Sequence, residues 1–314
     1  MSDAPTPRIS VVVPTYQRVA VVPEAVDSAL EDGGADVEVV VVDDGSTDGT
    51  VERLAERYGR DPRVRVVRKE NGGTASARNA GITVARGHYV ALLDSDDVFL
   101  PGHCAALAAP LDADPSVDLA IGDATYEGGW KRDGRSIFHR RRYRPPLDLE
   151  DMCEGLWVLP SATMWRTERL RALRFDETFR WAEDTELLFR FFAAGGRAVA
   201  VDRVVTRYRR QSGGQGAPNK QASADRIQRA RLLLQERYAD RTQDPTGHRL
   251  RLHRRWLRQL RKTGDVAAAR PHALAWWKAR PWSPAPWFAW WKVARRARSL
   301  DRRGADGGTG PTPG

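Results

Sequence analysis

Acidic side chains come directly after an apolar run that ends at residue 93. Residues 89–93 are predicted to form a buried strand, and Asp94-Ser95-Asp96-Asp97 follows it. Two carboxylates one residue apart on a turn can reach one hard cation, and Mg²⁺ and Mn²⁺ accept carboxylate oxygens while leaving positions for substrate phosphates. Exposed turns are also rich in aspartate, so the triplet alone does not decide. Its place directly after a buried strand favours a metal site.

A second acidic pair follows the apolar run at residues 37–42. Asp43 and Asp44 lie there, at the start of a Gly/Ser/Thr/Asp cluster. A carboxylate at a strand end can accept a hydrogen bond from a base N–H or a ribose hydroxyl. The cluster can also cap the next helix through Thr47 or Asp48, and the two interpretations are compatible. The chain lacks a G-x-G-x-x-G fingerprint in its first loop and lacks a Walker loop, which disfavours NAD-type and P-loop binding.

Two further patterns are weaker when taken alone. Asn71, Arg78 and Asn79 flank a Gly-Gly turn that enters a helix, and a helix N-terminus beside one arginine suits a diphosphate. Farther along, Glu183 and Asp184 precede a long apolar helix. One of these carboxylates could act as a general base. As an isolated pattern, the pair is explained by its favourable interaction with the helix dipole.

The elements that must position these residues alternate between strand and helix. This alternation, with continuous apolar strands, is typical of an α/β fold in which helices cover both faces of a mostly parallel sheet. Ligands of such sheets bind beyond the carboxyl ends of the strands, so the polar groups at three strand ends are expected to share one edge. The expected strands are 9–13, 37–42, 64–67, 89–93, 156–165 and 198–205, and the expected helices are 21–30, 48–58, 74–85, 185–194, 223–238 and 246–263.

Charge is distributed unevenly along the 314 residues. The chain has 51 lysines and arginines and 41 aspartates and glutamates, a net charge of +10, yet residues 1–125 hold 11 basic and 21 acidic side chains. A hydrophobic fraction of 41% supports a folded core. Two cysteines, Cys104 and Cys153, are too few for a disulfide framework or a zinc ribbon, and no apolar run reaches the ~18–20 residues that span a bilayer. A secreted scaffold, a membrane-spanning protein and a metal-cluster protein are therefore disfavoured, and a cytoplasmic location is expected.

Together these segments resemble the family 2 glycosyltransferases, inverting enzymes with the GT-A fold. Each block is common by itself, whereas five blocks in the family's order are specific. The resemblance covers about residues 8–212 and implies a GT-A nucleotide-diphospho-sugar transferase fold, with a C-terminal helical extension beyond it. The five blocks are 11–16 (VVVPTY), 41–48 (VVDDGSTD), 71–79 (NGGTASARN), 92–97 (LLDSDD) and 175–184, which begins with FDE and ends with Glu183-Asp184.

The resemblance also implies roles for single residues. Asp184 would be the general base that removes the acceptor proton, and Glu183 would be the less favoured base and would orient the acceptor. Asp96, with Asp94, would ligate Mn²⁺ or Mg²⁺, which would neutralise the departing diphosphate as a Lewis acid. The donor would be a UDP-, GDP- or TDP-sugar. Its expected binding residues are Pro14, Thr15, Tyr16, Arg18, Asp43 or Asp44, Asn71, Arg78, Asp94 and Ser95.

One departure from the family lies after the last expected strand. Several members place a histidine there, on a loop that closes over the donor, and Gln211 stands at about that place in this chain. An amide oxygen is a poorer metal ligand than imidazole, so metal binding is weaker or Arg209 or Arg210 holds the diphosphate instead. The chain also lacks the Gln-x-x-Arg-Trp block and the spanning helices of processive synthases, which favours addition of a single sugar.

The resemblance fades beyond about residue 220. Residues 249–303 carry 16 basic and 2 acidic side chains and seven of the 11 tryptophans. A helix beginning at Pro286 would place Trp287, Trp290, Trp291 and Ala294 on one face, a pattern typical of a membrane interface. The alternative is a helical layer whose tryptophans pack on the catalytic domain or on a second subunit. The expected domains are 1–220 (nucleotide half about 8–100, acceptor half about 123–220), a basic helical extension at 221–303 and a disordered tail at 304–314.

We therefore expect a metal-dependent inverting glycosyltransferase that moves a sugar to the hydroxyl of a glycan, lipid-linked saccharide, peptide or natural product. The alternative is a catalytically degenerate module that binds a sugar nucleotide or a membrane, and the intact acidic blocks speak against it. A nucleotidyltransferase would need a Gly-rich phosphate loop and a lysine, and residues 14–22 supply neither. The expected partners are the donor, an unidentified acceptor and an anionic surface at the inner membrane face, contacted through residues 271–303. Nucleic acid is not expected, and a homodimer is left open.

Overall fold

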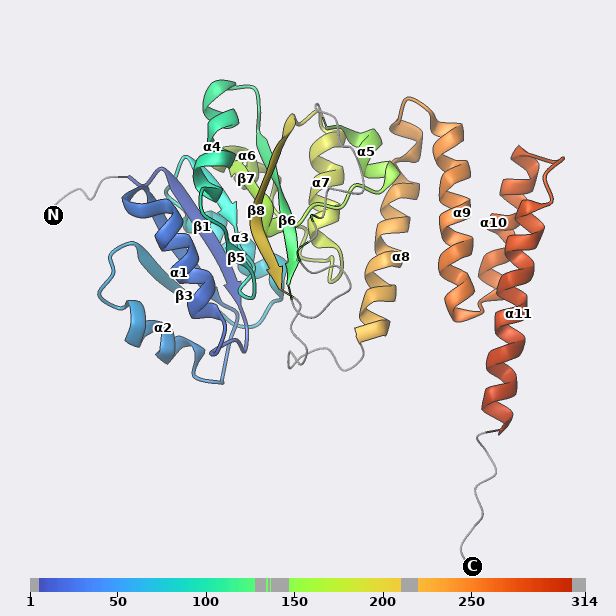
Figure 1. Ribbon diagram of the computed structural model, residues 1–314, viewed down its shortest axis with the longest axis horizontal. Coiled ribbons are helices and arrows are strands. Elements are labelled where there is room, and N and C mark those ends of the chain that lie inside the picture. The colour runs from blue at the N-terminus through green and yellow to red at the C-terminus, as the bar shows by residue number, and fades with distance from the viewer. Residues whose placement is uncertain (1–5, 128–133, 135, 137–146, 210–219, 307–314) are drawn as a thin grey trace, which may run out of the picture. The chain divides into compact units, whose positions relative to one another are not determined.

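The computed structural model in Figure 1 describes residues 6–127, 134, 136, 147–209 and 220–306. The chain divides into two compact units. Residues 1–152 and 156–218 form the first, which we call the sheet unit, and residues 153–155 and 219–314 form the second, the helical unit. The boundary expected after residue 220 lies close to this division.

The sheet unit is built around one sheet of eight strands: β1 (Ile9–Thr15), β2 (Val37–Asp43), β3 (Val64–Arg68), β4 (Tyr89–Leu92), β5 (Val98–Phe99), β6 (Leu119–Glu127), β7 (Thr163–Arg166) and β8 (Ala198–Arg209). Their order in the sheet is β3-β2-β1-β4-β7-β6-β8-β5. The first four strands in this order run parallel, β7 is antiparallel to β4 and β6, β8 is parallel to β6, and β5 is antiparallel to β8. The expected α/β architecture is confirmed.

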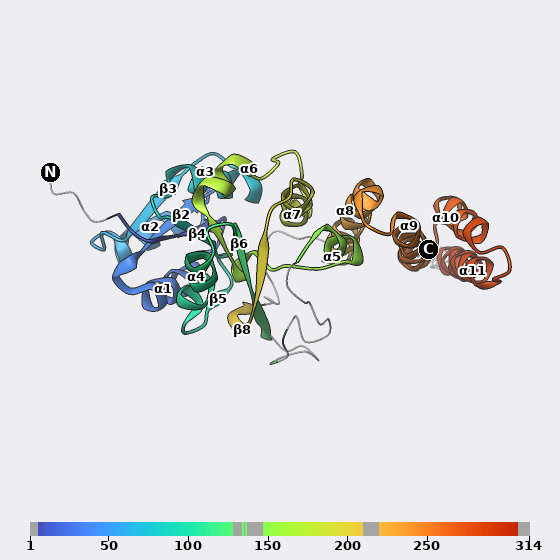
Figure 2. The same ribbon diagram turned by 90° about the horizontal axis from the view of Figure 1, so that it is seen from above.

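Helices cover both faces of this sheet. Figure 2 shows α1 and α4 on one face and α3 and α6 on the other. The contacts agree, because α1 packs on β1 and β2, whereas α3 packs on the same strands from the opposite side and on α6. The helices of this unit are α1 (Val22–Gly33), α2 (Thr50–Tyr58), α3 (Thr74–Val84), α4 (His103–Ala113), α5 (Leu149–Glu154), α6 (Thr167–Leu173) and α7 (Glu183–Ala193), and the last two residues of α5 fall in the helical unit.

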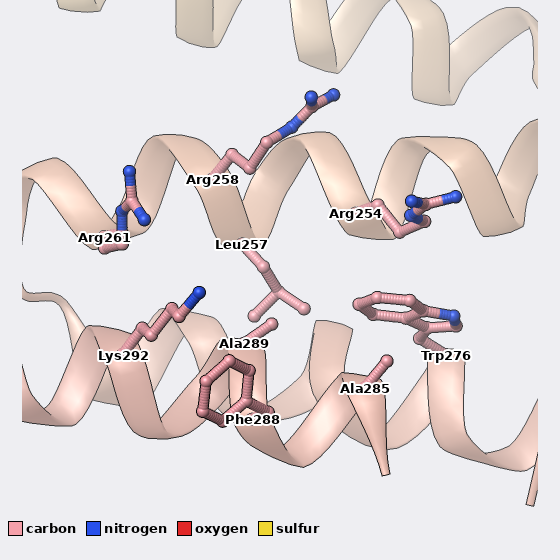
Figure 3. Close-up of a pocket in the computed structure, with 9 residues that line it drawn as sticks. All are labelled: Arg254, Leu257, Arg258, Arg261, Trp276, Ala285, Phe288, Ala289 and Lys292. Atoms are coloured by element: carbon pink, nitrogen blue, oxygen red, sulfur yellow. The ribbon is translucent and has the colours of Figure 1, made fainter. Parts of the chain in front are cut away.

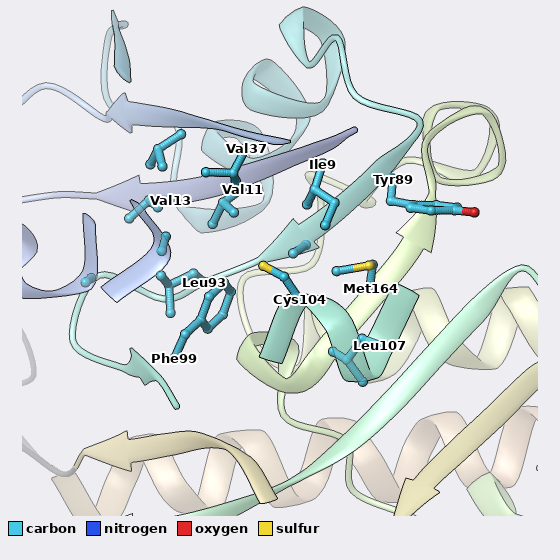
Figure 4. Close-up of a cluster of buried hydrophobic side chains, with 14 of the residues drawn as sticks. Ile9, Val11, Val13, Val37, Tyr89, Leu93, Phe99, Cys104, Leu107 and Met164 are labelled. Carbon is cyan, nitrogen blue, oxygen red and sulfur yellow. The ribbon is translucent and has the colours of Figure 1, made fainter. Parts of the chain in front are cut away.

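The largest core lies between the sheet and the helices α1 and α4. Successive side chains of a strand point to opposite faces. Val11 therefore joins the α1/α4 side, where Figure 4 shows Cys104 of α4 beside Met164 of β7, whereas Val42 packs with Ala77 of α3 on the other side. Both faces of the central strands are buried, which explains why these strands are continuous apolar runs in the sequence.

Some expected boundaries are wrong. The apolar run at 156–165 forms a strand only from Thr163, because Pro160 begins a short 3-10 helix (Pro160–Ala162) and a proline cannot donate to a strand ladder. Strand β8 continues four residues beyond its expected end. Helix α2 begins at Thr50, and its N-cap residue is Gly49. Asp48, one of the two expected caps, accepts a hydrogen bond from the N–H of Thr50 from outside the helix.

The helical unit contains α8 (Lys220–Tyr238), α9 (Pro245–Thr263), α10 (Val266–Ala279) and α11 (Ala285–Asp306). Its core brings together Trp256 and Leu257 of α9, Ala273 of α10 and Val293 of α11. Helix α11 includes residues 304–306 of the expected disordered tail, and the rest of that tail lies outside the described residues. Among the helices that the structure describes, none combines the length and apolar character needed to cross a bilayer.

Candidate active site

The carboxyl ends of β1, β2 and β4 meet at one edge of the sheet. In the pairing of β1 with β2, Thr15 lies opposite Asp43. The N–H of Asp44 donates to the carbonyl oxygen of Thr15 at 2.9 Å, and the N–H of Leu93 donates to the carbonyl oxygen of Val12 at 3.0 Å. The polar groups that follow these three strands therefore share one edge, as the alternation of elements predicts.

Thr15 and Asp43 contribute buried polar atoms to this edge. Within the described part of the chain, neither Oγ1 of Thr15 nor Oδ1 of Asp43 has a hydrogen-bond partner. The other carboxylate oxygen of Asp43 accepts from the N–H of Ser46 at 3.1 Å and lies 3.8 Å from Nε of Arg68. An unsatisfied buried polar group costs about 1–3 kcal/mol. A ligand that hydrogen-bonds to these two atoms would remove that cost.

The carboxylate of Asp44 is hydrogen-bonded to the loop that precedes α3. It accepts hydrogen bonds from the N–H groups of Gly72 at 3.0 Å and Gly73 at 2.7 Å, and from Nζ of Lys69 at 2.8 Å. Nδ2 of Asn71 donates to the carbonyl oxygen of Asp44 at 3.0 Å. Asp44 and Asn71 thus hold this loop in place, and of the two expected aspartates Asp43 is the better candidate for contact with a nucleotide.

The loop after β1 carries the other residues of the first block. Pro14 lies within β1, whereas the ring of Tyr16 is exposed at the strand end. Gln17 has a left-handed backbone with φ 55°, and its N–H donates to Oγ of Ser46 at 2.9 Å. The backbone N–H of Arg18 donates to a side chain of α2. The loop is therefore tied to the segment after β2, and Tyr16 is left accessible for stacking on a base.

The turn after β4 gathers four polar side chains. Asp94 and Asp96 are half-buried, whereas Ser95 and Asp97 are buried. Oγ of Ser161 donates to Asp97 at 2.6 Å and accepts from the N–H of Asp94 at 3.0 Å. Burial and the negative charges of Asp94 and Asp96 hold the pKa of Asp97 well above its usual range. Asp97 and Ser161 therefore fix the turn, and Asp94 and Asp96 remain accessible at its surface.

Asp94 and Asp96 suit a divalent cation in the chemistry of their side chains. Burial and the charge of Asp94 raise the pKa of Asp96, and Nη2 of Arg18, 3.6 Å away, opposes this only in part. In the residues that the structure describes, no three His, Cys, Asp or Glu side chains are placed to hold a metal ion. A Mg²⁺ ion bound by one or two carboxylates and by substrate phosphates does not need such a cluster.

Arg78 of α3 joins this turn to the start of α7. It is 2% exposed, and it donates from Nη2 to Asp94 at 2.6 Å and from Nη1 to Glu183 at 3.0 Å. Burial alone would lower its pKa, but the charges of Asp94 and Glu183 raise it, so the guanidinium stays protonated. Its guanidinium carbon lies 5.2 Å from the ring centre of Phe175. Contact with a diphosphate, as the resemblance implies, would require one of these ion pairs to open.

Glu183 and Asp184 are the first two residues of α7. The residue before them, Ala182, has a left-handed backbone with φ 60°, which is uncommon outside glycine. Burial holds the pKa of Glu183 above its usual range, although Arg78 lowers it and Asp184 raises it further. The hydrogen bonds of Asp184 run to the N–H and hydroxyl of Thr185, at 2.6 and 3.2 Å. Glu183 is thus committed to Arg78, which leaves Asp184 as the better candidate base.

The structure adds residues that the sequence did not single out. The ring of Tyr208 lies 6.0 Å from that of Trp157, and burial together with the charges of Asp97, Asp96 and Asp94 raises the pKa of Tyr208 to about 12. A neutral tyrosine therefore lies beside the acidic turn. Ser161, Trp157 and Tyr208 belong to no short motif, and the one available signal was the place of Tyr208 shortly before Gln211, on the loop expected to close over the donor.

Arg209 ends β8 and its guanidinium is already engaged. It pairs with Glu24 and, at 2.6 Å, with Glu127, while its backbone N–H donates to Asp97 at 3.1 Å. Arg209 could hold a diphosphate only if it left these two glutamates. Arg210 and Gln211, the other residues expected near the metal, lie outside the described residues.

Comparison of the sequence with models of protein families identifies the family. The model "Glycosyl transferase family 2" matches residues 10–180, which is more than half of the chain and contains β2, β4 and all of β1 except its first residue. The chain belongs to glycosyl transferase family 2. Two relatives support this: the glycosyltransferase GlyG of Streptococcus pneumoniae is 30% identical over 226 residues, 65% of this chain and 71% of the relative, and the succinoglycan biosynthesis protein ExoO of Rhizobium meliloti is 35% identical over 207 residues, 62% and 58%.

Other relatives are much longer than this chain. The chondroitin synthase of Pasteurella multocida is 45% identical over 95 residues, which are 30% of this chain and 10% of that protein. The chain therefore corresponds to about a tenth of that synthase. The match is 95 residues long, so the comparison with this synthase concerns less than a third of the chain.

Solved structures share the fold. Staphylococcus aureus TarS residues 1–349, solved in complex with UDP-GlcNAc, is 20% identical with a TM-score of 0.61, covering 96% of this chain and 92% of that one. A mannosyltransferase from Pyrobaculum calidifontis, solved with GDP-Man and Mn²⁺, is 21% identical with a TM-score of 0.58, covering 95% and 80%. The GT-A glycosyltransferase fold expected from the five blocks is confirmed.

Proposed function

We propose that this glycosyltransferase is a metal-dependent inverting enzyme that moves a sugar from a nucleoside-diphosphate donor to an acceptor hydroxyl. The observation that carries the proposal is the bridge made by Arg78, which joins Asp94 of the acidic turn to Glu183, the neighbour of Asp184. Donor-side and acceptor-side carboxylates are thereby held by one buried cation. The nucleotide sugars bound by the two solved relatives support the choice of donor.

The nucleotide is proposed to bind at the ends of β1 and β2. Oδ1 of Asp43 would accept an N–H of the base, and Oγ1 of Thr15 would hydrogen-bond beside it, which satisfies two atoms that are otherwise unpaired in the described structure. Tyr16, exposed at the same edge, would cover the base or ribose. The bases of UDP-, GDP- and TDP-sugars each carry a ring N–H that could donate to Asp43.

Asp94 and Asp96 would hold Mn²⁺ or Mg²⁺ when the donor is bound. When bound, the cation would act as a Lewis acid that stabilises negative charge on the leaving diphosphate. The chain itself contributes the two half-buried carboxylates, Arg18 near Asp96 and the buried Asp97–Ser161 pair that keeps the turn rigid. The Mn²⁺ complex of the Pyrobaculum enzyme supports this proposal.

Asp184 is proposed to take the acceptor proton. As the acceptor oxygen forms its bond to the anomeric carbon, its proton passes to the carboxylate of Asp184, and the bond from that carbon to the diphosphate oxygen breaks. The nucleoside diphosphate leaves from the opposite face, so the configuration inverts. Glu183 would hold Arg78 and orient the acceptor. A glycan or lipid-linked saccharide is the favoured acceptor class, because relatives are named for chondroitin and succinoglycan synthesis.

Calorimetric titration of UDP, GDP and TDP, each with and without Mn²⁺, tests the donor site. We expect one nucleotide to bind in a metal-dependent way and the binding to be lost in Asp96→Asn. In Asp184→Asn we expect donor binding to be retained, while the slow release of nucleoside diphosphate from the sugar nucleotide in water falls at least 100-fold, the range that a general base contributes. Asp202→Asn, at an exposed position on β8, is the matched control and should change neither quantity.

Three outcomes would contradict the proposal. Binding of no nucleotide would favour the degenerate module, and unchanged turnover in Asp184→Asn would remove Asp184 from the role of base. Nucleotide binding that needs no Mn²⁺ and is retained in Asp96→Asn would show that the enzyme lacks the proposed metal site.

A further inference from the structure

Five large aromatic side chains are exposed on α10, on α11 and in the connection between them. Trp282, in the short connection between α10 and α11, is 96% exposed, and the other four are 36–56% exposed. Folded proteins seldom leave so much aromatic surface in water unless it contacts a partner or a membrane. We call these residues the aromatic row: Trp277, Trp282, Trp287, Phe288 and Trp291.

The aromatic row is distinct from the tryptophans that build the core of this unit. Trp256 is buried, and Trp276 and Trp290 pack against the same core cluster. Trp290, which was expected on one face with Trp287 and Trp291, is thus half-buried against this core, and its ring centre lies 6.2 Å from that of Trp287. The structure separates tryptophans that stabilise the fold from those that the fold leaves exposed, and packing within the described residues does not account for the second group.

Cations lie against two rings of the aromatic row. Nζ of Lys292 lies 4.4 Å from the ring centre of Phe288, and the guanidinium of Arg295 lies 5.5 Å from the ring of Trp291. The two rings stack on each other with centres 5.7 Å apart. Rings and cations therefore form one mixed surface on α11, in which apolar faces and positive charges alternate.

A pocket of about 270 Å³ lies beside this surface, between α9 and α11. Figure 3 shows Leu257 and Trp276 pointing into the space between the helices. The charged side chains that line the pocket are all basic: Arg254, Arg258, Arg261 and Lys292. The neighbouring groove along α11 contains one acid, Asp225, which lies 3.5 Å from Lys262 and accepts from Gln259. The pocket, several times the ~30 Å³ of a water molecule, suits an anionic group such as a phosphate.

We propose that the aromatic row and the basic pocket bind the surface of an anionic lipid bilayer. Indole rings favour the boundary between headgroups and acyl chains, where the apolar face and the N–H are both satisfied. Basic residues beside them attract anionic headgroups, and the pocket would receive a lipid phosphate. The excess of 16 basic over 2 acidic residues in 249–303 complements such a surface. A second copy of the chain is disfavoured because two such basic faces repel each other.

Co-sedimentation of the full chain with vesicles tests this proposal. We expect binding to vesicles of phosphatidylcholine with 30% phosphatidylglycerol, and at least tenfold weaker binding to phosphatidylcholine alone. Trp282→Ser combined with Trp287→Ser and Trp291→Ser should weaken binding to the anionic vesicles at least tenfold. Lys292→Gln with Arg295→Gln should weaken it severalfold and reduce its dependence on salt. Leu233→Ser, at an exposed apolar position on α8, is the matched control and should bind like the wild type.

Several results would overturn the proposal. These are no binding to anionic vesicles, equal binding to neutral vesicles, or full binding by the triple tryptophan variant. A single-stranded oligonucleotide that displaces the protein from vesicles at equal charge concentration would identify a nucleic-acid surface instead. Loss of a concentration-dependent dimer in the triple variant would identify a subunit interface. Nucleotide binding by the sheet unit is measured separately, so failure here leaves the proposed catalytic function untouched.

Discussion

At the residue scale, the neighbours Asp43 and Asp44 differ in what they bind. Asp44 accepts three hydrogen bonds from the loop before α3, whereas Asp43 has one buried oxygen without a partner among the described residues. The sequence places both side chains at the end of β2 but does not distinguish them. The distinction depends on Lys69 and Gly72, which are 25 and 28 residues away.

We predict that asparagine at these two positions has different effects. Asp43→Asn should leave stability within about 1 kcal/mol of the wild type, because the amide oxygen can still accept from Ser46, but should weaken nucleotide binding at least tenfold, because an NH₂ group would face the base N–H. Asp44→Asn should lower the free energy of unfolding by about 2–3 kcal/mol, because it removes the charge that pairs with Lys69 in a buried place. Urea unfolding and calorimetry measure the two quantities.

The two variants serve as controls for each other. If Asp44→Asn weakened nucleotide binding with no loss of stability, Asp44 would be the base-binding residue. If both variants lost stability equally, Asp43 would be structural and the base would bind elsewhere at this edge.

At the scale of elements, the sequence predicts the strands whose two faces are both buried. β1, β2 and β4 are mostly apolar runs, and each ends where a polar group begins, so the functional edge follows from the pattern. β7 is not predictable in this way, because the apolar run before it contains Pro160 and its length fits several structures. The pairing of β7 between β4 and β6 is a tertiary choice that no local pattern encodes.

The candidate site likewise combines residues that a local pattern predicts with contacts that depend on tertiary packing. Its members on strand ends are predicted, because the chain brings them there through local structure. The hydrogen bonds between its parts are not predicted, because Arg78 and Glu183 are 105 residues apart in the sequence and Ser161 and Asp97 are 64 apart. Such contacts depend on how α3, α7 and the 3-10 helix at Pro160 pack together, which a single sequence does not state.

Helix α4 begins with a buried histidine that makes the sheet unit sensitive to acid. Nδ1 of His103 lies 3.1 Å from the carbonyl oxygen of Val205, its ring stacks on Phe99, and burial lowers its pKa to about 4. An unfolded histidine has a pKa of about 6.5. Between these values the unfolded chain binds more protons than the folded one, so the histidine's contribution to stability is complete above about pH 6.5 and is lost as the pH falls toward 4.

We predict that, as the pH falls from 7.5 to 5.0, the lowered pKa of His103 reduces the free energy of unfolding by about 2 kcal/mol. His103→Gln keeps a side-chain donor for Val205 but does not titrate, so its stability should depend less on pH by that amount. Urea titrations of both proteins at the two pH values give the difference. A variant with the same pH dependence as the wild type would show that folding does not lower the pKa of His103.

At the scale of the whole molecule, each unit contains one free, buried cysteine. Cys104 lies on α4 in the core of the sheet unit, and Cys153 belongs to the helical unit. Burial and the charge of Asp32 raise the pKa of the Cys104 thiol, so it reacts only when its surroundings open. The rate at which each thiol is labelled therefore reports the opening of one unit, and the two units can be followed separately in a single sample.

We predict that the sugar-nucleotide donor with Mn²⁺ protects Cys104 but not Cys153. A ligand that binds only the folded sheet unit, at 100 times its dissociation constant, stabilises that unit by about 2.7 kcal/mol, which lowers the population of its open state about 100-fold. Labelling of Cys104 in mild urea, located by peptide mass spectrometry, should slow by about that factor, whereas the rate at Cys153 should stay within twofold. Asp96→Asn should abolish the protection at Cys104. Equal protection of both thiols would mean that the two units unfold together, so that donor binding stabilises the helical unit as well.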